Sequence, residues 1–375
     1  MKHLSVLIKP SSSLCNMRCK YCFYHNVSDL RDVKSYGFMS DGTMKKIIDQ
    51  VFLDLDDDDV MTFAFQGGEP TLIGLEFFKN FIAYVKKQPK KVRVFYSLQT
   101  NGTTVDESWC EFFVENQFLV GLSIDVTKSN HDENRYDAKG RGTYGQVMKA
   151  KKMFDAYGVD YNVLCVLTNP LARRPQMVFD WLLKEKIDFV QFIPCLEELE
   201  KAEKSVFPLT QARFAHFYNG LFKLWYKSFA SGHYISIKLF DDVISLLATG
   251  RVGACGLLGD CNPQYVVEAD GSTYPCDFYV LDDYVMGNLT EETMFSMRKS
   301  EKLQAFLASN DEPLPTGCQK CPFKQMCFGG CKRMGQTVYW NESEQMCGYQ
   351  AFLAENIHLI EQIAKQEKLY QQKSK

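Results

Sequence analysis

Six short apolar runs that alternate with helix-period segments constrain the fold of this chain more than any other feature. The runs are rich in Val, Ile and Phe, and they occupy residues 4–8, 60–66, 92–99, 119–125, 161–167 and 189–194. Strands that are apolar almost throughout are typical of a parallel sheet covered on both faces, with a right-handed crossover helix after each strand. Because a full barrel has eight such units, we expect an α/β fold with a partial (β/α)6 barrel.

The remainder of the chain has a different pattern. Two helical stretches, 209–230 and 239–250, lead into a cysteine-dense region that begins at Cys255. Within it, Asp270-Gly271 lies between alternating segments and predicts a β-hairpin. A last helix is expected over 346–370. We therefore interpret this part of the chain as a second region, distinct from the barrel.

Length and charge set the broad class of the protein. A chain of 375 residues suits two domains. We place the partial barrel in residues 1–235, and linker helices, a cysteine-rich domain and the C-terminal helix in residues 236–375. The formal net charge is -3, and basic residues are dispersed among acidic ones, so neither nucleic acid nor an anionic membrane is an expected partner.

The cysteine content points to metal ligation. The first residues, "MKHLSVLIKP", lack the apolar region of a secretory signal, and no run approaches the ~18 apolar residues of a membrane span. These features predict a cytoplasmic protein. Thiols stay reduced in that compartment, so a disulfide framework is disfavoured for the fourteen cysteines.

Three cysteines form a compact cluster after the first apolar run. Cys15, Cys19 and Cys22 have the spacing Cys-x3-Cys-x2-Cys. Soft thiolates suit zinc or an iron–sulfur cluster. With no fourth cysteine nearby, one metal position is left open for a substrate or cofactor, unless a distant Cys or His completes a structural zinc loop.

Polar motifs follow the next runs along the chain. They are "QGGEP" with Gly67 and Gly68, "QTNG" with Asn101, and "SID" with Ser123 and Asp125. The carboxyl ends of parallel strands meet at one edge of the sheet, where α/β proteins build their sites. Glycine there lets the backbone approach a ligand that a Cβ would block. We therefore expect the active site at this edge.

The cysteine cluster, quoted as "CNMRCKYC", resembles the signature of the radical S-adenosylmethionine (SAM) superfamily. The resemblance implies a [4Fe–4S] cluster on Cys15, Cys19 and Cys22, whose unique iron is chelated by SAM. It also implies that Arg135 pairs with the SAM carboxylate, a role that suits a guanidinium. The full set of cofactor-binding residues implied by the resemblance is Tyr21, Gly67, Gly68, Glu69, Asn101, Ser123, Arg135 and Leu196.

A second cysteine array lies downstream, and eight thiols equal two sets of four. The stretch "CQKCPFKQMCFGGC" and the preceding "GSTYPC" resemble the SPASM domain. The resemblance implies two auxiliary [4Fe–4S] clusters, one on Cys255, Cys261, Cys276 and Cys331 and the other on Cys318, Cys321, Cys327 and Cys347. Two four-cysteine zinc sites are the alternative. The remaining thiols, Cys110, Cys165 and Cys195, have apolar neighbours and are interpreted as packing residues.

The order of motifs resembles the anaerobic sulfatase-maturating enzymes, and Tyr24, Gln66 and Asp277 share in that resemblance. It implies that a Cys or Ser in a sulfatase polypeptide is oxidised to Cα-formylglycine. Asp277 would remove the thiol or hydroxyl proton while an electron passes to the nearby auxiliary cluster, and Tyr24, Gln66 and Asp125 would contact the substrate. The implied partners are a sulfatase segment of the type Cys/Ser-x-Pro-x-Arg and an electron donor such as a flavodoxin or ferredoxin.

Two other functions stay open at this point. One is a SPASM radical SAM maturase that crosslinks a ribosomal peptide. Such maturases often carry a peptide-recognition domain before the barrel, whereas this chain reaches Cys15 after fourteen residues. The other is a zinc-stabilised adaptor that binds peptides without turnover. Iron content and colour distinguish the adaptor from both enzymes.

Overall fold

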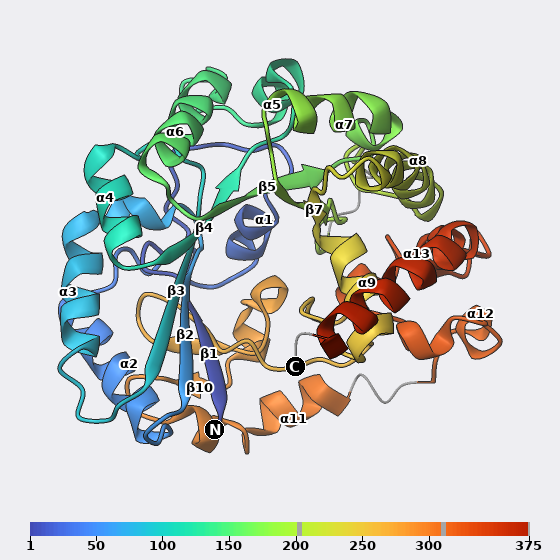
Figure 1. Ribbon diagram of the computed structural model, residues 1–375. Helices are drawn as coiled ribbons and strands as arrows, with labels where there is room; N and C mark the ends of the chain where they lie inside the picture. Colours follow the sequence, from blue (N-terminus) through green and yellow to red (C-terminus); the bar gives the residue numbers. More distant parts are fainter. Residues whose placement is uncertain (201–204, 309–312, 374–375) are drawn as a thin grey trace. The chain divides into compact units, whose positions relative to one another are not determined.

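The computed structural model describes residues 1–200, 205–308 and 313–373 (Figure 1). The chain forms two compact units. The first unit comprises Met1–Ile124, His131–Asn162 and Pro263–Ser309, and the second comprises Asp125–Asn130, Val163–Asn262 and Asn310–Lys375. Because segments of the two units alternate along the chain, the domain boundary expected between residues 235 and 236 stays a prediction.

A parallel sheet forms the centre of the first unit. Its strands β1 (His3–Ile8), β2 (Val60–Phe65), β3 (Arg93–Thr100) and β4 (Phe118–Ser123) are neighbours in that order. Ile8 pairs with Phe65, and Phe65 pairs with Leu98. Each strand overlaps an apolar run that predicts it. Their carboxyl ends therefore lie at one edge, as the polar motifs require.

Helices separate these strands along the chain. They are α1 (Phe23–Asp29), α2 (Asp41–Leu53), η1 (Pro70–Ile73), α3 (Leu75–Val85), α4 (Glu107–Glu115), α5 (Lys128–Asn134) and α6 (Tyr144–Tyr157). Aromatic side chains hold α3 to the sheet, since the Phe65 ring centre lies 5.0 Å from that of Phe78 and 5.1 Å from that of Phe81. All three rings are buried. Burying a large apolar side chain contributes roughly 1.5–3 kcal/mol, so this cluster fixes the helix on the sheet.

A hairpin from the cysteine-dense region completes the first unit. β8 (Val266–Val267) runs parallel to β1, while β9 (Ser272–Tyr274) pairs antiparallel with β8 and β10 (Gly287–Asn288) pairs antiparallel with β9. The turn contains Gly271 at φ +94°, a conformation that favours glycine. The predicted hairpin is therefore present, and its pairing brings residues 266–277 beside the end of β1.

The second unit contains the other predicted strands and helices. β5 (Tyr161–Leu167) pairs in parallel with β6 (Phe189–Pro194), which pairs with β7 (Ser236–Ile237). Its long helices are α7 (Pro175–Lys184), α8 (Gln211–Ala230), α9 (Lys238–Thr249) and α13 (Gly348–Lys373). The helices expected over 209–230, 239–250 and 346–370 are thus confirmed.

The remaining elements are short. They are η2 (Leu171–Arg173), η3 (Asp277–Tyr279), η4 (Asp282–Tyr284), α10 (Met294–Met297), α11 (Glu301–Ala308), α12 (Thr316–Gln319), η5 (Lys324–Met326), η6 (Lys332–Met334), β11 (Trp340–Asn341) and β12 (Met346–Cys347).

Two sequence expectations concern packing and membranes. Cys110, Cys165 and Cys195, which were expected to be packing residues, are all buried. Among the helices that the structure describes, none is both long and apolar enough to cross a membrane.

Candidate active site and cluster pockets

The loop that carries the first three cysteines joins β1 to α1. Cys15 and Cys19 are half-buried, whereas Cys22 is exposed. Burial raises the pKa of the Cys15 thiol to about 12, although the Met17 N–H donates to its sulfur at 3.4 Å, and the negative charges of Glu69 and the other two thiols add to the rise. A bound cation would reverse this preference and deprotonate the thiol. Cys15, Cys19 and Cys22 are the residues of this loop that would hold a cluster, as thiolates.

Backbone hydrogen bonds fix this loop to the segment that carries Arg135. The Arg18 N–H donates to the Tyr136 carbonyl at 2.8 Å, and the Lys20 N–H donates to the Asn134 carbonyl at 3.0 Å. Arg135 is buried, and its guanidinium carbon lies 5.6 Å from the centre of the Tyr21 ring. Two of the predicted SAM-binding residues, Tyr21 and Arg135, are thus brought together beside the cysteines.

Gly67 and Gly68 bring the end of β2 against the cysteine loop. The Gly68 N–H donates to the Ser12 carbonyl at 2.9 Å. A Cβ on Gly68 would lie 2.1 Å from the Leu14 carbonyl oxygen, and one on Gly67 would lie 2.9 Å from the Ser12 carbonyl oxygen. Gly67 also has φ +136°. These glycines allow close contact between two loops. The sequence pattern indicated close approach to a ligand and did not indicate this role.

Glu69 organises the ends of β2 and β3 from inside the protein. Its Oε1 accepts from the Thr100 hydroxyl at 2.7 Å, and its Oε2 accepts from the Asn101 N–H at 2.8 Å. Burial raises the pKa of Glu69, and these donors oppose the rise. Asn101 in turn donates to Asn16 in the cysteine loop at 2.9 Å. Glu69 and Asn101 therefore support the loop, and their predicted contacts with SAM stay predictions.

Three other predicted residues lie at strand ends. Ser123 is the last residue of β4 and is half-buried. Asp125 and Leu196 belong to the second unit. Asp125 is fully buried and accepts a hydrogen bond from the Val166 N–H at 3.2 Å, while Leu196 is half-buried. Their predicted roles toward SAM and substrate are not tested by these contacts.

Asp277 is held between a cation and an amide. It begins η3 directly after Cys276, and it is 8% exposed. The Lys9 Nζ lies 2.6 Å from its Oδ1, and the Gln66 side-chain amide donates to its Oδ2. The Asp277 N–H donates to the Gln264 side chain at 3.0 Å. The structure thus brings Gln66 and Asp277 into contact, as expected for two residues of one site.

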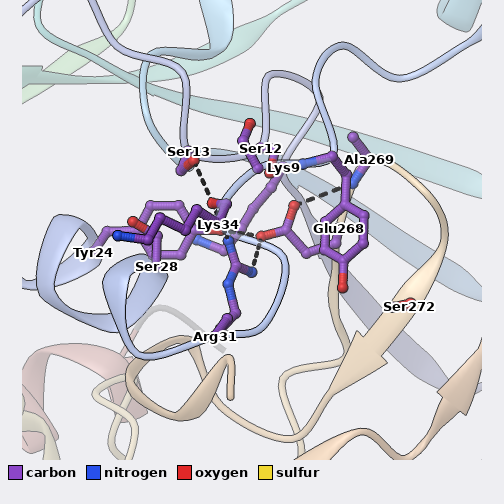
Figure 2. Close-up of polar contacts among 12 residues, drawn as sticks. Lys9, Ser12, Ser13, Tyr24, Ser28, Arg31, Lys34, Glu268, Ala269 and Ser272 are labelled. Atoms are coloured by element: carbon purple, nitrogen blue, oxygen red, sulfur yellow. Dashed lines mark hydrogen bonds and ion pairs between the residues drawn. The ribbon is translucent and has the colours of Figure 1, made fainter. Parts of the chain in front are cut away.

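Tyr24 is connected to Asp277 through Lys9, whose Nζ lies 3.7 Å from the centre of the Tyr24 ring. Tyr24 is 3% exposed, and its hydroxyl donates to Glu268 Oε1. The Arg31 guanidinium donates to the same oxygen at 2.6 Å (Figure 2). Burial and the adjacent Glu268 carboxylate raise the pKa of Tyr24. Its contact with substrate stays a prediction, because its polar end is already bonded inside the protein.

Sequence reasoning missed three of these residues: Lys9, Arg31 and Glu268. Lys9 and Glu268 each follow a short apolar strand directly, in "LIKP" and "VVEA". A charged residue at the end of a buried strand is a signal for a functional or paired group, because an unpaired buried charge is costly. Arg31 carries no comparable local signal.

Four thiols of the second unit line one cavity. Cys318, Cys321, Cys327 and Cys347 surround it together with Tyr339, Trp340 and Tyr349. Burial raises the pKa of Cys327 to about 12 and that of Cys318 to about 11, and neighbouring cysteines add to both rises. The Gln350 N–H lies 3.3 Å from the Cys347 sulfur. This thiol-lined cavity fits a metal cluster with four cysteine ligands.

The other predicted ligand set gathers three thiols in the second unit. The pKa of Cys255 is raised to about 11, mainly by burial and in smaller part by the charges of Cys331 and Cys261. A Cβ on Gly256 would lie 2.8 Å from the Cys331 Cβ, which shows how closely the two segments pack. Cys276, the fourth predicted ligand, belongs to the first unit. Its assignment to this set stays a prediction.

The spacing of the thiols bears on the kind of metal. In the part of the chain that the structure describes, no three Cys, His, Asp or Glu side chains are close enough to hold a single metal ion. Zinc gathers its four ligands at about 2.0–2.3 Å. A four-iron cluster binds each thiolate on a separate iron, so its ligands lie farther apart.

Comparisons with known proteins agree with this geometry. The model of the "Radical SAM superfamily" matches residues 10–177, and the SPASM model, "Iron-sulfur cluster-binding domain", matches residues 255–322. A solved structure described as "Native anSMEcpe with bound AdoMet and Kp18Cys peptide" superposes with a TM-score of 0.89 at 38% identity, over 97% of this chain and 99% of the other. Streptococcus suis SuiB, at 16% identity and a TM-score of 0.60, shares the fold.

Curated relatives cover nearly the whole chain. The cysteine-type anaerobic sulfatase-maturating enzyme of Clostridium novyi (strain NT) is 39% identical over 97% of this chain and 98% of the relative. The cysteine-type enzyme of Clostridium perfringens (strain 13 / Type A) is 43% identical over 89% and 90%, and the serine-type enzyme of Bacteroides thetaiotaomicron is 28% identical over 88% and 83%. The predicted α/β fold and the predicted resemblance are confirmed. This chain belongs to the anaerobic sulfatase-maturating enzymes, a family of radical SAM enzymes with a SPASM domain.

Proposed function

We propose that this chain oxidises a cysteine or serine side chain of a sulfatase polypeptide to Cα-formylglycine, also called 3-oxoalanine, without oxygen. The enzyme uses SAM and three [4Fe–4S] clusters, one that binds SAM and two auxiliary ones. Cysteine-type relatives are 39% and 43% identical to this chain, whereas a serine-type relative is 28% identical. This difference supports cysteine as the preferred target.

The reaction removes two electrons from the target side chain. When bound, SAM and the clusters supply a 5′-deoxyadenosyl radical that takes a hydrogen atom from the target Cβ, and an acceptor for the second electron. The chain itself must then take the thiol or hydroxyl proton. A serine gives the aldehyde directly, whereas a cysteine gives a thioaldehyde that water converts to the aldehyde with release of hydrogen sulfide.

The observation that carries the proposal is the geometry of Asp277. This carboxylate is 8% exposed, directly follows the predicted cluster ligand Cys276, and is fixed by Lys9 and Gln66. A general base must be held within hydrogen-bond reach of the proton that it abstracts. Asp277 is therefore the proposed base.

Partners and location complete the proposal. We propose a substrate segment of the type Cys/Ser-x-Pro-x-Arg and an electron donor such as a flavodoxin or ferredoxin. We also propose a cytoplasmic location, because cysteines that hold iron–sulfur clusters need a reducing compartment.

Mass spectrometry of a substrate peptide tests the function. A peptide with Cys-x-Pro-x-Arg, and a second one with Ser-x-Pro-x-Arg, are incubated with the iron-loaded enzyme, SAM and a reductant. We expect formylglycine in both peptides, with a faster rate for cysteine. SAM cleavage without the formylglycine mass shift would instead favour the peptide-crosslinking maturase.

The variant Asp277→Asn tests the proposed base. We expect SAM cleavage to continue while formylglycine falls by about 10²–10⁴-fold, because the amide cannot accept the proton. Both products are measured in one reaction, as 5′-deoxyadenosine by chromatography and as formylglycine by mass spectrometry. Asp283→Asn, an exposed change in η4, is the matched control. Full formylglycine yield from Asp277→Asn would remove it as the base.

A further inference from the structure

The first unit buries more charge than the proposed proton transfer needs. Lys9, Arg31, Glu268 and Asp277 are 0%, 4%, 0% and 8% exposed. Two are cations and two are anions, so their formal charges balance. A buried ion pair is weak evidence for stability, because desolvation offsets most of the attraction. The arrangement of these groups is therefore better explained by what it orients.

The contacts form one continuous path from Arg31 to Asp277, and Figure 2 shows the part of it around Arg31, Glu268, Tyr24 and Lys9. Arg31 donates to Glu268 at 2.6 Å and to the Lys34 carbonyl at 3.0 Å. Glu268 accepts from the Tyr24 hydroxyl, which fixes the Tyr24 ring under the Lys9 ammonium at 3.7 Å. Lys9 then holds Asp277 Oδ1 at 2.6 Å. Each group thus fixes the next.

The two oxygens of Asp277 have unequal partners. Lys9 is fully buried. If its contact with Oδ1 broke, the Lys9 ammonium would be left inside the protein without a compensating charge. Gln66, which bonds to Oδ2, is neutral and half-buried. Replacing an amide donor by a thiol or hydroxyl donor keeps one hydrogen bond on that oxygen. Oδ2 is therefore the oxygen at which a substrate proton can be exchanged.

We propose that Lys9, Tyr24, Glu268 and Arg31 form a positioning network that fixes Asp277 through its Oδ1 and leaves Oδ2 to receive the proton of the target side chain. Gln66 occupies Oδ2 until the substrate binds. This inference rests on the proposed function, in which Asp277 is the base. The four network residues act through Asp277, and none of them takes part in the proton transfer itself.

The test measures coupling, defined as formylglycine formed per 5′-deoxyadenosine released. Lys9→Met keeps the length of the side chain without its charge, and Glu268→Gln removes the charge that fixes Tyr24. We expect each to lower the coupling ratio by about 10–100-fold, because a displacement of about 1 Å of a reacting group costs about 10²-fold. Lys9→Arg keeps the charge and should recover most of the ratio. A merely structural role would lower both products together and leave the ratio unchanged.

Matched controls come from an exposed ion pair on α3. Lys79 and Glu76 lie 3.6 Å apart and are 53% and 75% exposed at the side chain. Lys79→Met and Glu76→Gln repeat the two chemical changes outside the network, and their coupling ratio should equal that of the unmodified enzyme. Iron content and circular dichroism of every variant report whether it has folded.

Tyr24→Phe keeps the proposal testable if the buried-charge variants do not fold. It removes one hydroxyl, and with it the bond to Glu268, while the ring under Lys9 remains. We expect a smaller fall in the ratio, about 3–10-fold, in the range of one lost hydrogen bond. An unchanged ratio in Tyr24→Phe would overturn the network.

The outcomes separate this inference from the function on which it rests. In the Asp277→Asn background, Lys9→Met should cause no further fall in the ratio, because both act on one group. One result would overturn the positioning network and leave the proposed base intact. In that result, Lys9→Met and Glu268→Gln fold and keep full coupling, whereas Asp277→Asn loses formylglycine. Full product from Asp277→Asn would instead overturn the proposed base.

Discussion

The three-cysteine loop and the four-cysteine pocket place their thiols in opposite environments. In the loop, Cys22 is exposed and its two partners are half-buried. In the pocket of the second unit, Cys318, Cys327 and Cys347 are buried and Cys321 is half-buried. Aromatic side chains, Tyr339, Trp340 and Tyr349, wall the pocket, whereas backbone hydrogen bonds to residues 134 and 136 fix the loop.

This difference separates two uses of the same ligand chemistry. An exposed thiolate site with one open metal position can admit a co-substrate. A buried site with four thiolates excludes one and is suited to electron transfer, since burial and hydrogen bonds to sulfur set its potential. We therefore expect damage to the loop to stop SAM chemistry, and damage to the pocket to spare it.

The largest effect is expected from the triple variant with Ala at Cys15, Cys19 and Cys22. SAM cleavage should be abolished, because the variant lacks all three predicted ligands of the SAM-binding cluster. Iron should fall from about twelve to about eight per chain, the sum for two remaining four-iron clusters. Anaerobic iron analysis and 5′-deoxyadenosine release measure both. Persistent SAM cleavage would show that the cluster is bound elsewhere.

A change in the four-cysteine pocket should spare SAM cleavage, which the triple variant abolishes. Cys327→Ala removes a buried predicted ligand, so iron should fall by about four per chain and the melting temperature should drop, because cluster binding contributes to folding. SAM cleavage should continue while formylglycine is lost. Cys165→Ala changes a buried cysteine of the same unit that is outside both predicted ligand sets, so this control should keep all of its iron. The comparison fails if Cys327→Ala abolishes SAM cleavage as fully as the triple variant does.

The smallest effect is expected where the loop meets β2. Gly68→Ala would place a Cβ 2.1 Å from the Leu14 carbonyl oxygen, which should destabilise the protein by about 1–3 kcal/mol. Gly145→Ala is the control, because no heavy atom lies within 4 Å of its added Cβ, and its effect should be under about 1 kcal/mol. Denaturation in urea measures both. Equal stability of the two variants would show that the contact between β2 and the loop is not rigid.

Local spacing explains why the sequence was so informative about the clusters. Cys15, Cys19 and Cys22 lie within eight positions, so any compact loop brings them together. The strands were equally readable, because the apolar runs match β1 to β6 and each is followed by a helix. The hairpin at Asp270-Gly271 was readable from its turn residues.

The buried network was not readable in this way. Arg31 and Glu268 are separated by 237 positions and Gln66 and Asp277 by 211, and no periodicity links residues so distant. The role of Gly68 was also out of reach, since it depends on the path of a neighbouring loop.

The sequence by itself therefore determined the α/β class, the spacing of the thiols and the family to which the chain belongs. Only the tertiary structure decided which groups surround Asp277. The physical reason is that β8 pairs with β1, and this pairing places Glu268 and Asp277 beside Lys9. The contacts of a buried charge are thus set by strand pairing, whereas cysteine spacing is set by the chain itself.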